Sequence, residues 1–300
     1  MKAFISTVFL ALLGISVQAQ TPVSLKLNLE KGKVYTVKST SKQTMQITAG
    51  GQLINIDVLS NNVVSYKVLK QDKDIMDIEL KFDTIASKTN SPMGNKETNS
   101  AKPAGNEPLE KIMNKLSTYK IIAKISTSGK FIEFVNYPKF KDNVLFVLDS
   151  IPTTKRDQAK MIANALIQES AIRTRIEPLF AYLPEKSVKT GDVWETTYSL
   201  AANNGTLLSL NTFTLNGMEN NLAKISGKSE IESLPSNDPS AQMSQDLKGT
   251  MTSDGTIDLT TGLVLKNTSK GHIEGAMTMK SNNSEMKVKM DSQSETIMLK

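Results

Sequence analysis

Apolar and polar residues alternate with a period of two along most of the chain. Near the start, Val23, Leu25, Leu27 and Leu29 alternate with small or charged residues, and the same pattern runs from Trp194 to the C-terminus. This period is typical of strands that bury one face and expose the other. Antiparallel sheets commonly have one such wet face. The sequence therefore predicts a mainly β fold, of the β-rich α+β kind.

A helical pattern interrupts this alternation in the middle of the chain. From Thr153 or Thr154 onward, apolar residues recur at helical spacing, namely Ala159, Ile162, Ala163, Leu166 and Ile167. Such a stripe is typical of a helix that packs on a core. We expect residues 151–182 to be a helical connector between a first β-rich half, 20–150, and a second, 183–300. These would be two related antiparallel meanders that form curved sheets or a half-barrel, with the connector packed on them.

Residues 87–107 also break the strand pattern. The segment is polar, contains proline and glycine, and has one large apolar residue, Met93. A segment of this composition buries too little apolar surface to offset the entropy lost on ordering. We therefore predict a flexible insertion here.

Two short stretches share a Gly-x-Val-aromatic pattern and indicate an internal repeat. Gly32 and Tyr35 in LEKGKVYTV correspond to Gly191 and Trp194 in VKTGDVWET, where Asp192 follows the glycine. Glycine readily adopts positive φ in a turn, and a large aromatic mainly supplies buried contact area. We interpret these five residues as a structural motif, since a catalytic residue would seldom recur as a generic aromatic.

A second pair of stretches supports the repeat. ISTSGKFI at 125–132 and MTSDGTID at 251–258 share a central glycine, and Asp254-Gly255 is a turn signature. The two members of the first pair lie farther apart in the sequence than the two members of the second pair. The difference is about the length of the insertion and short helix in the first half.

The N-terminus indicates export. Lys2 precedes a short apolar stretch, and Val17-Gln18-Ala19 has small residues at the positions of a cleavage site. We predict that residues 1–19 are a secretory signal and that the mature chain has no transmembrane segment. The absence of cysteine excludes disulfides, a thiolate nucleophile and cysteine-bound zinc. We expect an exported protein of the periplasm, the outer surface or the extracellular medium.

The distribution of charge along the chain argues against nucleic-acid binding. The full chain has a formal net charge of +6, but its lysines are scattered and only three arginines occur: Arg156, Arg173 and Arg175. Nucleic-acid binders cluster their positive charge and favour arginine and stacking aromatics. We therefore expect no nucleic-acid partner.

The segment YLPEKSVKTGDVW at 182–194 follows the helical pattern and contains Leu183, Pro184, Lys189, Gly191, Asp192 and Trp194. In this Leu-Pro…Lys-x-Gly-Asp-x-Trp pattern the chain resembles a family of exported Bacteroidota proteins of unknown function. The opening LNLEKGKVY at 27–35 is similar to the start of that family as well. The resemblance implies export and a shared fold over nearly the whole mature chain. It implies no activity, cofactor or catalytic residue.

Candidate catalytic chemistry is sparse. His272 is the only histidine, and no Gly-x-Ser-x-Gly elbow is present. A carboxylate-dependent hydrolase could use Asp254, Asp258 and Glu274, but both aspartates lie in predicted turns, where aspartate commonly bonds the backbone. We predict no catalytic residues, no metal site and no cofactor, and we keep the hydrolase as the least favoured alternative.

Methionine is concentrated near the C-terminus and suggests a ligand. Met277 and Met279 share one strand face, as do Met286, Val288 and Met290. Methionine is flexible and polarisable, which suits an adaptable apolar surface. We predict a non-enzymatic envelope protein in which these five residues bind a lipid-like or apolar small molecule. The alternative is a structural or interaction protein with an envelope-protein partner, a filled core and no cavity above about 300 Å³.

Overall fold

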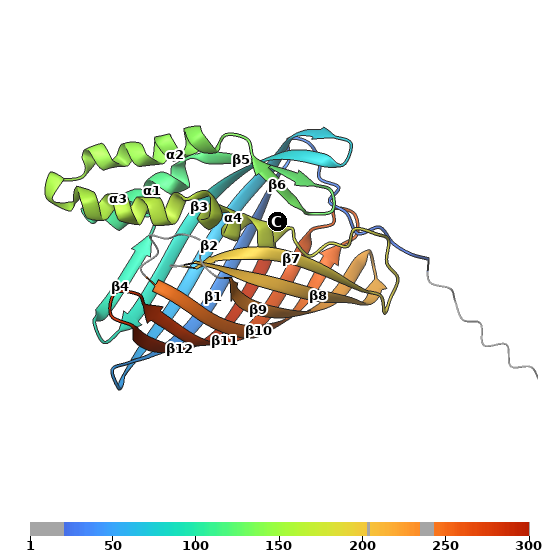
Figure 1. The fold of residues 1–300 in the computed structure, drawn as a ribbon. Coiled ribbons are helices and arrows are strands. Elements are labelled where there is room, and N and C mark those ends of the chain that lie inside the picture. The colour runs from blue at the N-terminus through green and yellow to red at the C-terminus, as the bar shows by residue number, and fades with distance from the viewer. Residues whose placement is uncertain (1–20, 203–204, 235–242, 300) are drawn as a thin grey trace, which may run out of the picture.

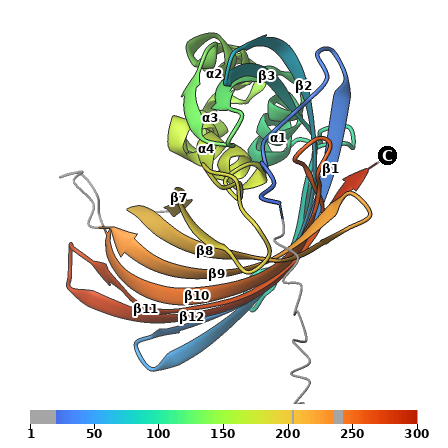
Figure 2. The same ribbon diagram turned by 90° about the vertical axis from the view of Figure 1, so that its right-hand side faces the viewer.

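The computed structural model describes residues 21–202, 205–234 and 243–299. These residues form twelve strands, all paired antiparallel in one curved sheet that does not close (Figures 1 and 2). The mainly β fold with curved sheet and central helices is confirmed. The strands are β1 (Val34–Ala49), β2 (Gln52–Asp72), β3 (Ile75–Ser91), β4 (Gly94–Asn99), β5 (Lys120–Ser126), β6 (Phe131–Phe134), β7 (Val193–Ala202), β8 (Gly205–Glu219), β9 (Leu222–Leu234), β10 (Met243–Asp258), β11 (Val264–Met279) and β12 (Ser284–Leu299).

The first and last strands pair in the middle of the sheet. The strand order is β6-β5-β3-β2-β1-β12-β11-β10-β9-β8-β7, with β4 added beside β3. The register of β1 and β12 joins Thr36 to Leu299 and Ala49 to Met286. The two predicted β-rich halves therefore share one sheet, whose edges are β6 and β7.

The helices gather on the concave side of the sheet (Figure 2). They are α1 (Pro108–Thr118), α2 (Tyr137–Leu145), α3 (Thr153–Ile167) and α4 (Glu169–Ile176), with 3₁₀ turns at Phe146–Ser150 and Glu177–Leu179. α1 contacts β3 and β4, α2 contacts β5, and α4 contacts β7. The helical layer thus connects the two sides of the open sheet. None of the described helices is long and apolar enough to cross a membrane.

The main hydrophobic core lies between this helical layer and the sheet. The helices bury Ile112 and Leu116 of α1, Ala159, Ala163 and Ile167 of α3, and Ile172 and Ile176 of α4. They pack with the inner face of β3, where Met76, Ile78 and Leu80 have no exposed surface. The predicted α3 stripe is buried in this core, with Ala159, Ala163 and Ile167 fully buried and Ile162 and Leu166 partly so. However, α3 packs mainly on α1, α2 and α4, whereas the stripe predicts direct packing on the sheet.

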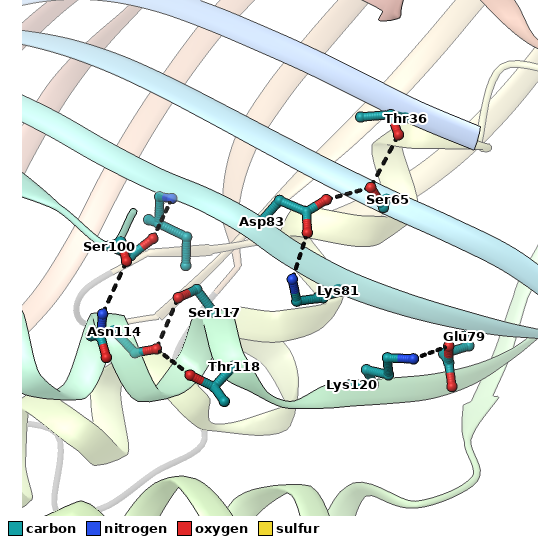
Figure 3. A network of polar contacts seen from close by, with 11 residues as sticks. Thr36, Ser65, Glu79, Lys81, Asp83, Ser100, Asn114, Ser117, Thr118 and Lys120 are labelled. Atoms are coloured by element: carbon teal, nitrogen blue, oxygen red, sulfur yellow. Dashed lines mark hydrogen bonds and ion pairs between the residues drawn. The ribbon is translucent and has the colours of Figure 1, made fainter. Parts of the chain in front are cut away.

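The segment 87–107 differs from its prediction as a flexible insertion. β3 continues to Ser91, and β4 returns antiparallel along it. Thr98 and Ser100 are buried, Ile85 N donates to Ser100 Oγ, and Asn114 Nδ2 donates to Ser100 O (Figure 3). Strand pairing and these bonds satisfy the backbone of a polar hairpin without an apolar core of its own. Composition alone cannot reveal such pairing.

The two motif glycines begin strands in the same way. Gly32 precedes β1 with φ of 83°, and Gly191 precedes β7 with φ of 90°. Gly32 N donates to Val68 O, and Gly191 N donates to Leu215 O. The Asp192 carboxylate accepts from the Lys189 N–H at 2.9 Å and so closes the second turn.

The two motif aromatics also occupy matching environments. Tyr35 stacks on Tyr66 with ring centroids 5.7 Å apart, and Trp194 stacks on Phe213 at 5.9 Å. In each case the partner lies directly opposite on the neighbouring strand. Both motif aromatics are buried, which is the packing role that the sequence suggests.

The second pair of similar stretches does not match in structure. Residues 125–132 contain the turn between β5 and β6, with Gly129 at φ of 81°. Residues 251–258 lie inside β10, where Asp254 pairs with Thr268 and Gly255 with Asn267. The turn predicted at Asp254-Gly255 is wrong, because pairing with strands on both sides overrides the local preference of the dipeptide.

Tyr182 joins the helical connector to the second half of the sheet. Its hydroxyl donates to Gly262 O at 2.9 Å and accepts from Val264 N at 3.1 Å. Its carbonyl oxygen accepts from Trp194 Nε1 at 3.0 Å. Burial raises the pKa of the Tyr182 hydroxyl, so the group stays a neutral donor.

Tyr182→Phe would leave Gly262 O and Val264 N without this partner in a buried place. We expect the free energy of unfolding to fall by about 1–3 kcal/mol, the usual cost of an unsatisfied buried polar group. Urea unfolding followed by the fluorescence of the single tryptophan measures it. Tyr119→Phe is the control, because the Tyr119 hydroxyl has no hydrogen bond among the described residues, and a change within about 0.5 kcal/mol is expected. Equal losses in both variants would contradict this role.

Candidate binding site

The inner face of the sheet carries a second apolar cluster, separate from the main core. Its buried members are Leu207, Ile231, Leu247, Ile273 and Val288, and its partly buried members are Met45, Ile47, Met251, Met277 and Met290. All of these lie on β1 or β8–β12, and no residue of a described helix is among them. We call this group the methionine cluster.

A band of small and polar residues separates the main core from the methionine cluster. On β1 the inner face runs from Val37 in the core, through Ser39 and Ser41, to Met45 in the cluster. The other strands of this region follow the same order. We call the intervening residues the polar band: Ser39, Ser41, Asn211, Ser229, Ser253, Asn267, Ser269, Ser294 and Thr296.

Strand register aligns serines across this part of the sheet. Going from β10 through β11, β12, β1 and β2 to β3, one row of directly opposed residues reads Ser253, Ser269, Ser294, Ser41, Ser60 and Ser87. Ser269 and Ser294 hydrogen-bond each other at 2.7 Å. These serines come from distant parts of the chain, so the row appears only once the register is known.

A cavity of about 310 Å³ lies where the polar band meets α4. The sheet side includes most of the polar band together with Met251, and the opposite side is formed by Thr174, Arg175, Pro178 and Leu179. The volume is near the lower end of the range of about 300–1,000 Å³ for small-molecule sites. The cavity borders both the main core and the methionine cluster.

Gly227, on β9, leaves room beside two residues that line this cavity, Ser253 and Phe213. A Cβ on Gly227 would lie 2.5 Å from Ser253 Oγ and 2.8 Å from Phe213 Cε1. Larger residues would therefore crowd the inner surface beside the cavity. The need for small residues beside the cavity cannot be predicted from the sequence, because each glycine or serine looks like an ordinary interruption of a strand.

Arg175 is the one charged residue among the described residues that line the cavity. It lies deep in the fold, and loss of solvation lowers the pKa of its guanidinium. Its side chain keeps partial exposure, as expected for a residue that lines a cavity. The sequence showed Arg175 only as one of three arginines, with nothing to distinguish it.

The five residues predicted to bind a ligand are only partly brought together. Met277, Val288 and Met290 belong to the methionine cluster. Met286 is partly buried and pairs with Met277, whereas Met279 is 37% exposed near the end of β11. Met251, which the prediction did not include, is the cluster member that lines the cavity.

His272 lies on the outer face of the sheet. Its Nδ1 is 2.8 Å from Asp291 Oδ1, and its Nε2 is 3.6 Å from Glu274 Oε2. Two surface grooves beside it, of about 500 and 440 Å³, are larger than the inner cavity but more open. The inner cavity is the better candidate because helix and sheet enclose it from two sides.

The outer face also brings a serine and an aspartate together, without a histidine. Ser65 Oγ donates to Asp83, and Lys81 Nζ donates to Asp83 Oδ1 at 2.8 Å (Figure 3). His272 is on β11, three strands away from Ser65 on β2. These groups form a surface network and lack the geometry of a Ser-His-Asp triad.

The three acidic residues of the hydrolase alternative have separate surroundings. Asp254 is exposed in β10, and Glu274 contacts His272. Asp258 accepts hydrogen bonds from the Thr260 N–H and the Thr261 hydroxyl and so shapes the turn after β10. Within the described part of the chain, no group of three or more histidine, cysteine, aspartate or glutamate residues could hold a metal ion.

Residues 73–264 match DUF6263, a family of unknown function. The chain belongs to this family. The match includes α4 with Arg175 and the segment with Gly191, Asp192 and Trp194. Membership in a family of unknown function is confirmed. The link to Bacteroidota and the Leu-Pro…Lys-x-Gly-Asp-x-Trp segment as a mark of that family stay predictions. No curated protein matches the chain.

Among solved structures, the chain is similar to lipovitellin, in a structure described by its lipid–protein interactions. The TM-score is 0.50 at 11% identity, over 91% of this chain and 26% of that chain. The DUF6263 chain thus spans about a quarter of the lipovitellin chain, and the likeness concerns the fold alone. Weaker likenesses are to an outer membrane channel from Pseudomonas putida F1 (TM-score 0.29, 8% identity, 91% of this chain and 98% of that one) and to Pseudomonas aeruginosa OpdQ (0.27, 6%, 89% and 100%).

His272 yields a prediction about the outer face. The hydrogen bond to Asp291, and to a lesser degree Glu274, raises the pKa of His272 above 6.5. We expect Asp291→Asn to lower this pKa toward 6.5, and Glu274→Gln to lower it less. As the only histidine, it gives one set of imidazole signals in an NMR titration.

The His272–Asp291 pair also predicts how the stability of the fold depends on pH. A raised histidine pKa stabilises the fold below pH 6.5, and this contribution is lost as the pH rises through the folded-state pKa. Asp291→Asn should therefore lower stability slightly at pH 5.5 and leave it unchanged at pH 8.5. The effect should be small, because exposed ion pairs contribute little. An unchanged His272 pKa in Asp291→Asn would contradict the pairing.

Proposed function

We propose that this DUF6263 protein is an exported, non-enzymatic envelope protein that binds a lipid-like apolar chain on the inner face of its sheet. The cavity of about 310 Å³ between α4, the main core and the methionine cluster carries this proposal. It is a concave space in which the polar band faces apolar side chains of the main core and Met251, and small-molecule sites likewise combine apolar surface with polar groups.

The methionine cluster supplies an adaptable surface next to the cavity. Met45, Met251, Met277 and Met290 are only partly buried. Unbranched thioether side chains change rotamer at low cost and fit irregular apolar partners. An acyl chain that enters beside Met251 could therefore extend along this cluster by displacing flexible side chains.

The likeness to lipovitellin supports lipid as the ligand class. That structure is described by its lipid–protein interactions, and its fold resembles this chain over most of the chain's length. The predicted signal at residues 1–19, which lies outside the described residues, supports a place in the periplasm, at the outer surface or in the extracellular medium.

The second candidate is a structural or interaction protein without a ligand. It is favoured by the burial of the five central residues of the methionine cluster, which are 5% to 8% exposed. These side chains already pack with their neighbours in the cluster without a ligand. The cavity is only just above the threshold of about 300 Å³ that would separate the two candidates. Binding measurements therefore decide between them.

We expect the purified protein to bind a fluorescent fatty-acid probe that unlabelled palmitate displaces. Met251→Gln combined with Met290→Gln should weaken palmitate about 5- to 30-fold, since roughly 1–2 kcal/mol of apolar contact is lost. Native mass spectrometry of protein from its own host should show a bound small molecule.

The matched control carries two changes on the outer face of the same strands, Lys248→Gln with Lys289→Gln. Both lysines are exposed, and this variant should bind palmitate as the wild type does. Recovery of empty protein, together with no probe binding, would remove the ligand proposal and favour the structural candidate.

A further inference from the structure

We propose that Arg175 holds the anionic head group, a carboxylate or a phosphate, of a single-chain amphiphile inside the cavity. This inference rests on the proposed function and names the chemistry of its ligand. It derives from an unpaired cation in an interior space, and it assigns the head group and the tail to different parts of the inner face.

Arg175 has no counter-charge among the residues that the structure describes. No hydrogen bond or ion pair joins its guanidinium to another described residue. None of the described cavity-lining residues is acidic. Loss of solvation is the sole cause that shifts the pKa of Arg175, which agrees with the lack of a nearby carboxylate.

The neighbouring arginine on α4 shows the contrast. Arg173 Nε and Nη2 donate to the two carboxylate oxygens of Glu177 at 2.7 and 3.0 Å, and its guanidinium lies 4.9 Å from the ring centroid of Phe131. Glu177 is therefore already occupied. A free guanidinium in an interior space is costly unless an anion joins it, and its planar donors suit carboxylate and phosphate oxygens.

Further polar groups face the same cavity. Ser253 and Asn267 line it, and their side chains have no hydrogen-bond partner among the described residues. Each can donate to an anionic oxygen. By contrast, Ser39 is bonded to Thr296 at 2.9 Å, and Ser229 donates to Asn211 at 2.7 Å. The free donors of Ser253 and Asn267 therefore line the same cavity as the guanidinium of Arg175.

The position of the cavity indicates where the alkyl tail of the ligand lies. Met251 lines it and belongs to the methionine cluster, so an alkyl chain attached to a head group at Arg175 meets this apolar surface. The polar band would surround the head group and its first carbons. The modest volume favours one chain over two.

The experiment compares ligands with the same C16 chain and different head groups by isothermal titration calorimetry. Wild-type protein should bind palmitate and hexadecyl phosphate about 10-fold or more tightly than hexadecanol, as expected for charge-assisted hydrogen bonds. Arg175→Gln should lose this preference while its affinity for hexadecanol stays the same. Arg175→Lys should keep part of it. Arg156→Gln, a change outside the cavity lining, should keep all of it.

The outcomes separate this inference from the proposed function. Equal binding of palmitate and hexadecanol, or a preference that persists in Arg175→Gln, would overturn the role of Arg175 and leave apolar-chain binding intact. If no C16 ligand binds, but inorganic phosphate binds and Arg175→Gln abolishes this, the proposed function fails and the site takes a free anion. If neither the C16 ligands nor inorganic phosphate bind, both proposals fail.

A stability measurement adds a test that needs no ligand. Because the guanidinium has no partner in the described part of the chain, Arg175→Met in ligand-free protein should unfold at the same or a higher urea concentration than the wild type. A clear drop in the urea midpoint would show that Arg175 supports the fold through a protein contact, and it would overturn the proposal.

Discussion

The pairing of β1 with β12 is the interaction on which the rest of the structure depends. It joins the first and last strands in the middle of the sheet, so both halves are held in one curved surface. The same register sets the three zones of the inner face. In the main core, Val37 lies opposite Met298. In the polar band, Ser39 lies opposite Thr296, and in the methionine cluster Met45 lies opposite Met290. A shift by one residue would turn every one of these side chains to the other face, which would destroy core and cavity together.

The polar band has a cost that packing alone does not explain. An interior lined with apolar side chains would bury more apolar area and leave fewer polar groups to satisfy. Several band residues limit this cost by bonding each other, as Ser269 does with Ser294. Others, such as Ser253, face the cavity without such a bond. A fold that only needed stability would gain by filling this space, so the band is better understood as the surface of a site.

The sequence predicted the architecture better than the site. Period-two alternation and the stripe at Ala159, Ala163 and Ile167 are local signals, and they correctly indicated strands and a packed helix. The hairpin within 87–107 and the continuation of β10 through Asp254-Gly255 could not be foreseen, because pairing with distant strands stabilises both. The methionine pattern indicated one face of β11 and β12, and Met277, Val288 and Met290 do lie together on it in the methionine cluster. It could not identify the cavity, which depends on strand register and on small residues from many strands.

Arg175 shows most clearly why a functional residue can escape sequence analysis. Arg173 on α4 and Glu177, the first residue after this helix, are four residues apart and therefore lie on the same side, where they pair. Arg175 is two positions from Arg173, roughly 200° around the helix at 3.6 residues per turn, so it lies on nearly the opposite side, where the sheet and the cavity are. The sequence RTR thus places two identical side chains in opposite electrostatic surroundings. One arginine is neutralised by a glutamate that directly follows its own helix. The other faces an interior space whose described lining contains no acid, and there only a bound anion would supply the missing charge.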